Sequence, residues 1–225
     1  MAKTGNIKVL IIDNHPLFIM GLSSLLEKTS KFNIIGTVEN YSNALKIAER
    51  ENPTLVLMEI RLGIENGFDF IQKLKSINPD ISILIISTLN EYFYSERILK
   101  SGARGYVLKT ESADTIMEAI NTVLDKKVYL SENTRERILH SMEGNADKDV
   151  NGDMTASVQM LSNRELQIFS LIAKGFGTIE IASTLKLSTK TIDAHKEHIK
   201  RKLHCNTAHE LRHQAIEWAN HCDSL

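Results

Sequence analysis

Polar and ionisable side chains end four of the short apolar runs in the first half of the chain. These residues are Asp13 and Asn14, Glu59, Ser87 and Thr88, and Lys109. They offer an acid, a second acid, a hydroxyl and an amine for one ionic, hydrogen-bonded site. One such residue needs no function, because the end of a buried run reaches the surface in any case. Four runs that end in this way favour a site.

The apolar runs are typical of strands that are buried on both faces. They are rich in Val, Ile and Leu and cover residues 8–13, 33–36, 55–59, 81–87 and 105–108. Amphipathic patterns between them predict helices at 17–28, 41–50, 68–77, 91–101 and 113–125. Five alternations of strand and helix predict an α/β doubly wound domain with a five-stranded parallel sheet.

This arrangement would gather the polar strand ends. Right-handed crossovers bring the carboxyl ends of parallel strands to one edge of the sheet, where ligands bind in such domains. In the first helix, one stripe is expected to hold Leu17, Met20, Gly21, Ser24 and Leu25.

The second half of the chain opens with a capping box. The Ser162 hydroxyl can accept from the amide of Glu165, whose carboxylate can reach back to Ser162. The helix that starts here should end before Gly175, a favourable residue at a helix end. Further patterns predict helices at 178–185, 189–204 and 208–220, which gives an all-α four-helix domain.

The third of these helices carries a local excess of positive charge. Six basic and two acidic residues lie between Lys186 and Lys202, although the whole chain has a net charge of −1. Its apolar stripe is Ile192, Ile199 and Leu203. A helix, a short turn and a basic helix are the plan of a helix-turn-helix module that binds DNA. A basic cluster can also be ordinary solvated surface.

Length and composition exclude several classes of protein. With 225 residues, 42% hydrophobic and 24% charged, the chain is neither disordered nor collagen-like. Its apolar stretches are far shorter than the roughly 20 residues of a membrane span. Two cysteines cannot form a disulfide framework, so we expect a cytoplasmic protein with no membrane partner.

A polar segment at 141–160, rich in Gly, Asn and Asp, indicates a domain boundary. We place one domain at 1–130 and the other at 159–225. The linker between them, 131–158, is expected to begin as a helix and to continue as flexible chain.

We expect neither an enzyme nor a metal site. His195 and His198 are three residues apart, and His209 and His213 are four apart, but no further ligands complete a zinc site. Cys205 is expected to be a buried apolar residue rather than a reactive thiol.

Residues 7–125 resemble a bacterial response-regulator receiver domain of the CheY type. The resemblance lies in VLIIDNHPLF (9–18), LVLMEIRLGIENG (55–67), ILIIST (83–88) and SGARGYVLKT (101–110). It implies a pocket in which acids bind Mg²⁺ and an aspartate takes a phosphoryl group from a histidine kinase. By position it assigns Asp13 to one of the acids, Ser87 and Lys109 to phosphoryl contacts, and Tyr106 to an aromatic that rotates on switching.

Three positions depart from the pattern of that family. The second acid is Asn14, the phosphoacceptor position holds Glu59, and Gly63 stands where the family usually has Pro. Asn14 removes one negative charge from the Mg²⁺ ligands. Glu59 carries its carboxylate one methylene further out, and a misplacement of about 1 Å can cost roughly 100-fold in rate. We therefore expect weak or absent Mg²⁺ binding and phosphotransfer, and no other cofactor.

Two interpretations of Glu59 stay open. Its carboxylate can reach Lys109 and Ser87 and imitate an acyl phosphate, with one charge in place of roughly 1.5 to 2. That would hold the domain in an active-like form. Alternatively, the pocket is degenerate and another input, such as a partner protein, sets the state.

Residues 160–219 resemble the LuxR-type DNA-binding domain. The resemblance lies in LSNRELQIFSLIAKG (161–175), IEIASTLKLSTKTIDAHKEHIKRKL (179–203) and HELRHQA (209–215). The candidate phosphate contacts are Thr191, His195, Lys196, Lys200, Arg201 and Lys202. The candidate base contacts are Lys190, Asp193, Ala194 and Glu197. Relatives often carry bases or polar residues where this chain has the two acids, so their target preference cannot be transferred.

The receiver, the linker and this domain together resemble the NarL/FixJ class of response regulators. The resemblance implies a transcription regulator that binds double-stranded DNA as a homodimer, with half-sites about one helical turn apart. The helix at 208–220 is a candidate dimer contact. We expect function without phosphorylation. The alternatives are a conventional regulator switched by a histidine kinase, and an interaction module that does not bind DNA.

Overall fold

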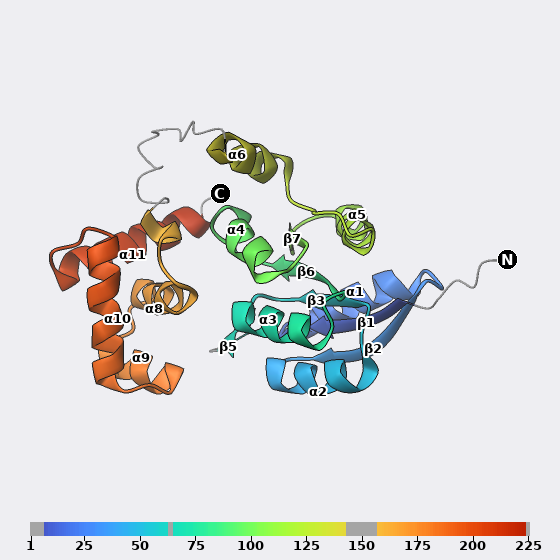
Figure 1. Cartoon of the computed structure of the whole chain (residues 1–225), viewed down its shortest axis with the longest axis horizontal. Coiled ribbons are helices and arrows are strands. Elements are labelled where there is room, and N and C mark those ends of the chain that lie inside the picture. Colours follow the sequence, from blue (N-terminus) through green and yellow to red (C-terminus); the bar gives the residue numbers. More distant parts are fainter. Residues whose placement is uncertain (1–6, 63–64, 143–156, 224–225) are drawn as a thin grey trace. The chain divides into compact units, whose positions relative to one another are not determined.

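The computed structural model describes residues 7–62, 65–142 and 157–223 (Figure 1). The chain divides into two compact units, Met1–Glu136 and Arg137–Leu225. Helix α6 (Glu132–Met142) crosses the division. Most of the flexible part of the linker expected after α6 lies outside the described residues. Among the residues described, no helix has both the length and the apolar character needed to cross a bilayer.

A five-stranded parallel sheet forms the first unit, as predicted, in the order β2-β1-β3-β6-β7. Its strands are β1 (Ile7–Ile12), β2 (Phe32–Val38), β3 (Leu55–Met58), β6 (Ser82–Ser87) and β7 (Gly105–Leu108). The helices between and after them are α1 (Pro16–Glu27), α2 (Tyr41–Glu51), α3 (Gly67–Ile77), α4 (Glu91–Ser101) and α5 (Ala113–Leu124). A short antiparallel pair that the sequence did not predict is formed by β4 (Arg61–Leu62) and β5 (Glu65–Asn66).

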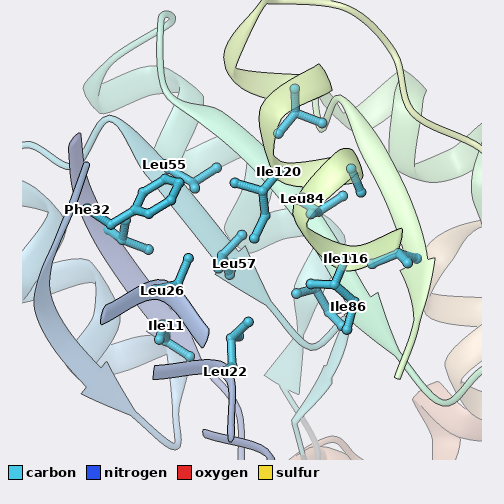
Figure 2. Close-up of a cluster of buried hydrophobic side chains, with 14 residues drawn as sticks. Ile11, Leu22, Leu26, Phe32, Leu55, Leu57, Leu84, Ile86, Ile116 and Ile120 are labelled. Carbon is cyan, nitrogen blue, oxygen red and sulfur yellow. The ribbon is translucent and has the colours of Figure 1, made fainter. Parts of the chain in front are cut away.

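Apolar side chains cover both faces of this sheet. On one face, β1 and β3 pack with Leu22 and Leu26 of α1 and with Ile116 and Ile120 of α5 (Figure 2). On the other face, α2 contacts β1 and β2, and α4 contacts β7. Burial on both sides explains the near-continuous apolar runs of the strands.

The packed stripe of α1 differs from the predicted one. Leu17 and Met20 are 83% and 67% exposed, whereas Leu22 and Leu26 are buried. The helix carries apolar residues on more than one side, so its periodicity could not select the side that meets the sheet. Two large apolar side chains of α1 therefore remain exposed.

In the described part of the second unit, a bundle with its own core is formed by helices α8 (Asn163–Ala173), α9 (Thr178–Leu185), α10 (Thr189–Lys202) and α11 (Ala208–Asp223). The predicted stripe of α10 is confirmed, since its apolar residues are all buried, and Phe169 packs on Trp218 at 5.4 Å between ring centroids. The helix ends two residues before the predicted position, because His204 takes a left-handed conformation with φ of 54°.

Candidate functional site

The carboxyl ends of β1, β3, β6 and β7 lie in one row at the edge of the sheet. Main-chain hydrogen bonds continue past the strands: the Glu59 amide donates to the Ile12 carbonyl, and the Lys109 amide to the Ser87 carbonyl, each at 2.9 Å. These bonds fix the strand-end residues relative to one another. Four of the predicted residues, Asp13, Glu59, Ser87 and Lys109, come together there.

Lys109 holds two buried carboxylates. Its Nζ lies 2.6 Å from Asp13 Oδ2, 2.9 Å from Asp13 Oδ1 and 3.1 Å from Glu59 Oε2. Asp13 is 2% exposed and Glu59 is 3% exposed. Buried charges of this kind are tolerated only when they are paired and hydrogen-bonded. The two buried carboxylates of the pocket therefore depend on the ammonium of Lys109 for charge compensation.

Hydrogen bonds hold the other oxygen of Glu59. The Ser87 hydroxyl donates to Oε1 at 2.5 Å, and the Arg61 amide donates to the same oxygen at 3.2 Å. Ser87 Oγ also accepts from the Leu89 amide at 3.2 Å. Both Glu59 oxygens thus have partners, and the carboxylate is fixed in one orientation.

Tyr106 of β7 is turned into the protein beside this cluster. It is 1% exposed, and its hydroxyl donates to the Leu89 carbonyl at 2.5 Å. Burial raises the pKa of Tyr106 well above its ordinary value, so the hydroxyl stays protonated and remains a donor. Leu89 thereby connects Tyr106 to Ser87.

Two of the predicted pocket residues lie outside the cluster. Asn14 and Thr88 are exposed, and in the described part of the chain no hydrogen bond joins either of them to the two carboxylates. Each follows a buried residue, and successive side chains of extended chain point to opposite sides. His15, which the sequence argument missed, does take part, because its Nδ1 lies 2.9 Å from Asp13 Oδ1 and 3.0 Å from Lys109 Nζ.

In the second unit, the predicted capping box is present. Ser162 Oγ accepts from the Glu165 amide at 3.3 Å, and the Ser162 amide donates to Glu165 Oε2 at 2.7 Å. Lys202 Nζ, at the end of α10, donates to the same oxygen at 2.7 Å. Because Glu165 is only 4% exposed, this bond ties α10 to the start of α8.

Lys202→Ala should lower the free energy of unfolding of this unit by about 1–2 kcal/mol, because the cap loses a hydrogen bond and the buried carboxylate loses its cation. Burial alone would raise the pKa of Glu165, but the bonds from Lys202 and Ser162 hold it below its ordinary value of 4.5. Its contribution is therefore present above pH 4.5 and is lost as the pH falls through the lowered pKa.

Urea unfolding at neutral pH and well below pH 4.5 would measure both effects. Arg201→Ala, an exposed neighbour, is the matched control. A difference between wild type and Lys202→Ala that is the same at both pH values would contradict the assigned role of the carboxylate.

A short turn with an unfavourable backbone conformation joins α9 to α10. Lys186 ends α9 in the left-handed region, with φ of 53° and ψ of 44°. Ser188 caps α10 by accepting from the Thr191 amide at 3.1 Å. The left-handed region normally favours glycine, so this position holds a long cationic side chain at a conformational cost.

The predicted DNA contacts of α10 fall into two groups by exposure. The exposed group is Lys190, Asp193, Ala194, Glu197 and Arg201. The partly buried group is Thr191, His195, Lys196, Lys200 and Lys202. Burial lowers the pKa of His195, so in the protein without DNA this side chain is neutral at pH 7.

Several cations of α10 already have partners within the unit. Lys196 Nζ donates to Thr178 Oγ1 at 2.7 Å, and Lys200 Nζ lies 2.9 Å from Glu197 Oε1. Among the residues that the structure describes, no ion pair or side-chain hydrogen bond engages Lys190 or Arg201. These two are the cations of α10 most available to a ligand.

Two protein-family models match the chain. Residues 9–121 match the response regulator receiver domain, and residues 159–215 match the bacterial regulatory proteins of the luxR family. The chain belongs to the NarL/FixJ class of response regulators. This response regulator is accordingly a DNA-binding regulator of transcription with a luxR-type helix-turn-helix domain.

Curated relatives cover almost the whole response regulator. The oxygen regulatory protein NreC of Staphylococcus carnosus is 30% identical over 211 residues, which are 93% of this chain and 97% of NreC. NreC of Staphylococcus aureus matches to the same extent.

Solved structures of RcsB from Salmonella share the fold. RcsB bound to the promoter P1flhDC in the presence of the phosphomimetic BeF3− has a TM-score of 0.67 at 21% identity, over 93% of this chain and 98% of that one. Another Salmonella typhimurium RcsB structure has a TM-score of 0.69 at 21% identity, over 94% and 98%.

Proposed function

We propose that this response regulator acts in the cytoplasm, binds double-stranded DNA as a homodimer and controls transcription without depending on phosphorylation. Its receiver would be held in an active-like form by Glu59, whose carboxylate takes the place of a phosphoaspartate. The observation that carries the proposal is that the two Glu59 oxygens engage Ser87 and Lys109 at the same time. A degenerate pocket would not require a carboxylate that bridges these two groups.

The chemistry of the pocket supports independence from phosphorylation. Phosphotransfer needs an accessible carboxylate oxygen and a bound Mg²⁺, but both Glu59 oxygens are engaged and buried. The Asp13 carboxylate is already paired with Lys109, and the second acid position holds the neutral, exposed Asn14. These residues fit Mg²⁺ poorly, because that ion favours carboxylate and water oxygens at near-octahedral positions.

The outward face of α10 is the proposed DNA contact. Lys190 at its start, together with Asp193, Ala194 and Glu197, would meet base edges. Arg201 would meet a phosphate, helped by Thr191, His195, Lys196 and Lys200. Lys202 is assigned to the capping box instead. RcsB structures have been solved on promoter DNA and as two dimers on two parallel DNAs, which supports duplex DNA and a second copy as partners here.

The unmodified full chain should bind its promoter duplex, and Glu59→Gln should weaken that binding about tenfold, within the 1–3 kcal/mol typical of coupled sites. Glutamine keeps an acceptor for Ser87 but loses the charge that faces Lys109. Fluorescence anisotropy on duplexes selected from genomic fragments measures the affinity. Incubation with a small phosphodonor and Mg²⁺, followed by mass spectrometry, should show no mass gain on residue 59.

Glu96→Gln, which alters a surface ion pair of α4 with Lys100, is the control and should leave the affinity unchanged. If Glu59→Gln binds DNA with unchanged affinity, Glu59 does not hold the receiver in an active-like form. A stoichiometric mass gain, with DNA binding that appears only afterwards, would establish a conventional phosphorylation switch. No duplex binding under any condition would indicate an interaction module.

A further inference from the structure

Residues 128–131, here termed the connector segment, continue the sheet beyond its last strand. Tyr129 forms a parallel bridge with Gly105 of β7. The Tyr129 amide donates to the Arg104 carbonyl at 2.9 Å, and the Tyr106 amide donates to the Tyr129 carbonyl at 3.0 Å. A Cβ at Gly105 would lie only 3.0 Å from the Tyr129 oxygen, so the segment approaches the strand closely. The connector segment therefore covers what would otherwise be an open sheet edge.

A second attachment fixes the other end of the connector segment. The amide of Ser131 donates to Glu91 Oε1 at 3.0 Å, and Glu91 is a buried residue in the first turn of α4. Leu130, between the two attachments, is also buried. Ser131 then starts α6, because its Oγ accepts from the Thr134 amide at 3.3 Å. The start of α6 is thus bound to the receiver.

Hydrogen bonds connect Glu59 to Tyr106, whose main chain forms the first attachment, and the second attachment, Glu91, lies next to this series along the chain. Glu59 accepts from Ser87, Ser87 accepts from the Leu89 amide, and the Leu89 carbonyl accepts from the Tyr106 hydroxyl. The main chain of Tyr106 bonds to the connector segment, and Glu91 follows Leu89 by two residues. Hydrogen-bond chains of this kind stabilise one another in a buried environment.

We propose that the connector segment docks reversibly along the edge of β7, and that the hydrogen bond between Glu59 and Ser87 controls how firmly it is held against β7 and α4. When this bond is made, the Ser87–Leu89 loop fixes Tyr106 and Glu91, and the start of α6 is held. When it breaks, both anchors loosen and the connector segment opens locally. This inference rests on the proposed role of Glu59, and it names the element through which the pocket would act on the rest of the chain.

Hydrogen–deuterium exchange of the full chain, without DNA, tests the proposal on peptides that span residues 126–135. Ser87→Ala lies in the pocket and does not touch the connector segment, yet it should raise the exchange rate there about three- to tenfold, the effect of one buried hydrogen bond. Glu91→Ala removes an anchor directly and should give a rise of at least that size. Tyr106→Phe, which removes only the hydroxyl that bonds Leu89, should act like Ser87→Ala.

Glu96→Ala, further along α4, is the matched control and should leave exchange in the connector segment at the wild-type rate. Peptides from β1 report global unfolding of the receiver. A faster exchange rate in the connector segment therefore supports the proposal only when the exchange rate of the β1 peptides is unchanged. Wild-type exchange in Ser87→Ala and Tyr106→Phe would overturn the coupling, and wild-type exchange in Glu91→Ala would overturn the docking. Exchange is measured without DNA, so its outcome does not depend on duplex binding. Failure of the proposed function would instead appear as absent duplex binding in the anisotropy experiment.

Discussion

Lys109→Met should destabilise the receiver unit by about 3–5 kcal/mol, because it leaves two buried carboxylates without their shared cation. Methionine fills a similar volume, so the loss would come from charge and not from a cavity. Urea unfolding followed by circular dichroism measures the effect. Trp218 is the single tryptophan of the chain and lies in the second unit, so its fluorescence should follow a transition close to that of wild type.

A second substitution separates the charge effect from a packing effect. Adding Glu59→Gln to Lys109→Met should recover a large part of the loss, since one of the two unpaired charges is gone. Lys100→Met removes an exposed lysine whose side chain is 79% accessible, and it should cost less than about 0.5 kcal/mol. No recovery in the double variant would show that Lys109 acts through its packing.

Lys190→Ala combined with Arg201→Ala should weaken DNA binding about 100-fold, because removal of each charge-assisted hydrogen bond costs about tenfold. Both side chains are exposed cations on the proposed DNA face. Each phosphate that is no longer neutralised also lowers the slope of log affinity against log salt concentration by about 0.9. If only Arg201 meets a phosphate, the slope falls by about 0.9, and by about 1.8 if both do. Anisotropy titrations across a series of salt concentrations give both quantities.

Lys202→Ala is the informative comparison for this pair of substitutions. It removes the same charge from the same helix, but its Nζ is committed to Glu165. It should therefore lower stability while the salt slope stays near the wild-type value. A salt slope that falls as far in Lys202→Ala as in Arg201→Ala would place Lys202 on the DNA instead.

The fold could be predicted because periodicity and strand composition are local properties of the sequence. The runs at 8–13 and 81–87 are continuously apolar over 9–12 and 83–86, as expected of strands covered on both faces, and the capping box marks the start of α8 directly. Four site residues followed from the same logic, since parallel strands end at one edge. The short pair of β4 and β5 and the packed side of α1 depend on tertiary contacts, which no local pattern contains.

The features of the two sites that the sequence did not predict also depend on tertiary contacts. Asn14 and Thr88 were included by adjacency along the chain, but adjacent side chains diverge in space. His15 joins the pocket through a turn in the main chain that returns its ring to Asp13 and Lys109. Lys202 looks like its basic neighbours in the sequence, and only its bond to α8 distinguishes it.

The left-handed backbone conformation of Lys186 has a consequence for stability. A glycine would adopt this backbone more easily, by roughly 1 kcal/mol, yet would carry no positive group beside the start of α10. The turn between α9 and α10 therefore keeps a backbone strain that a single substitution would relieve.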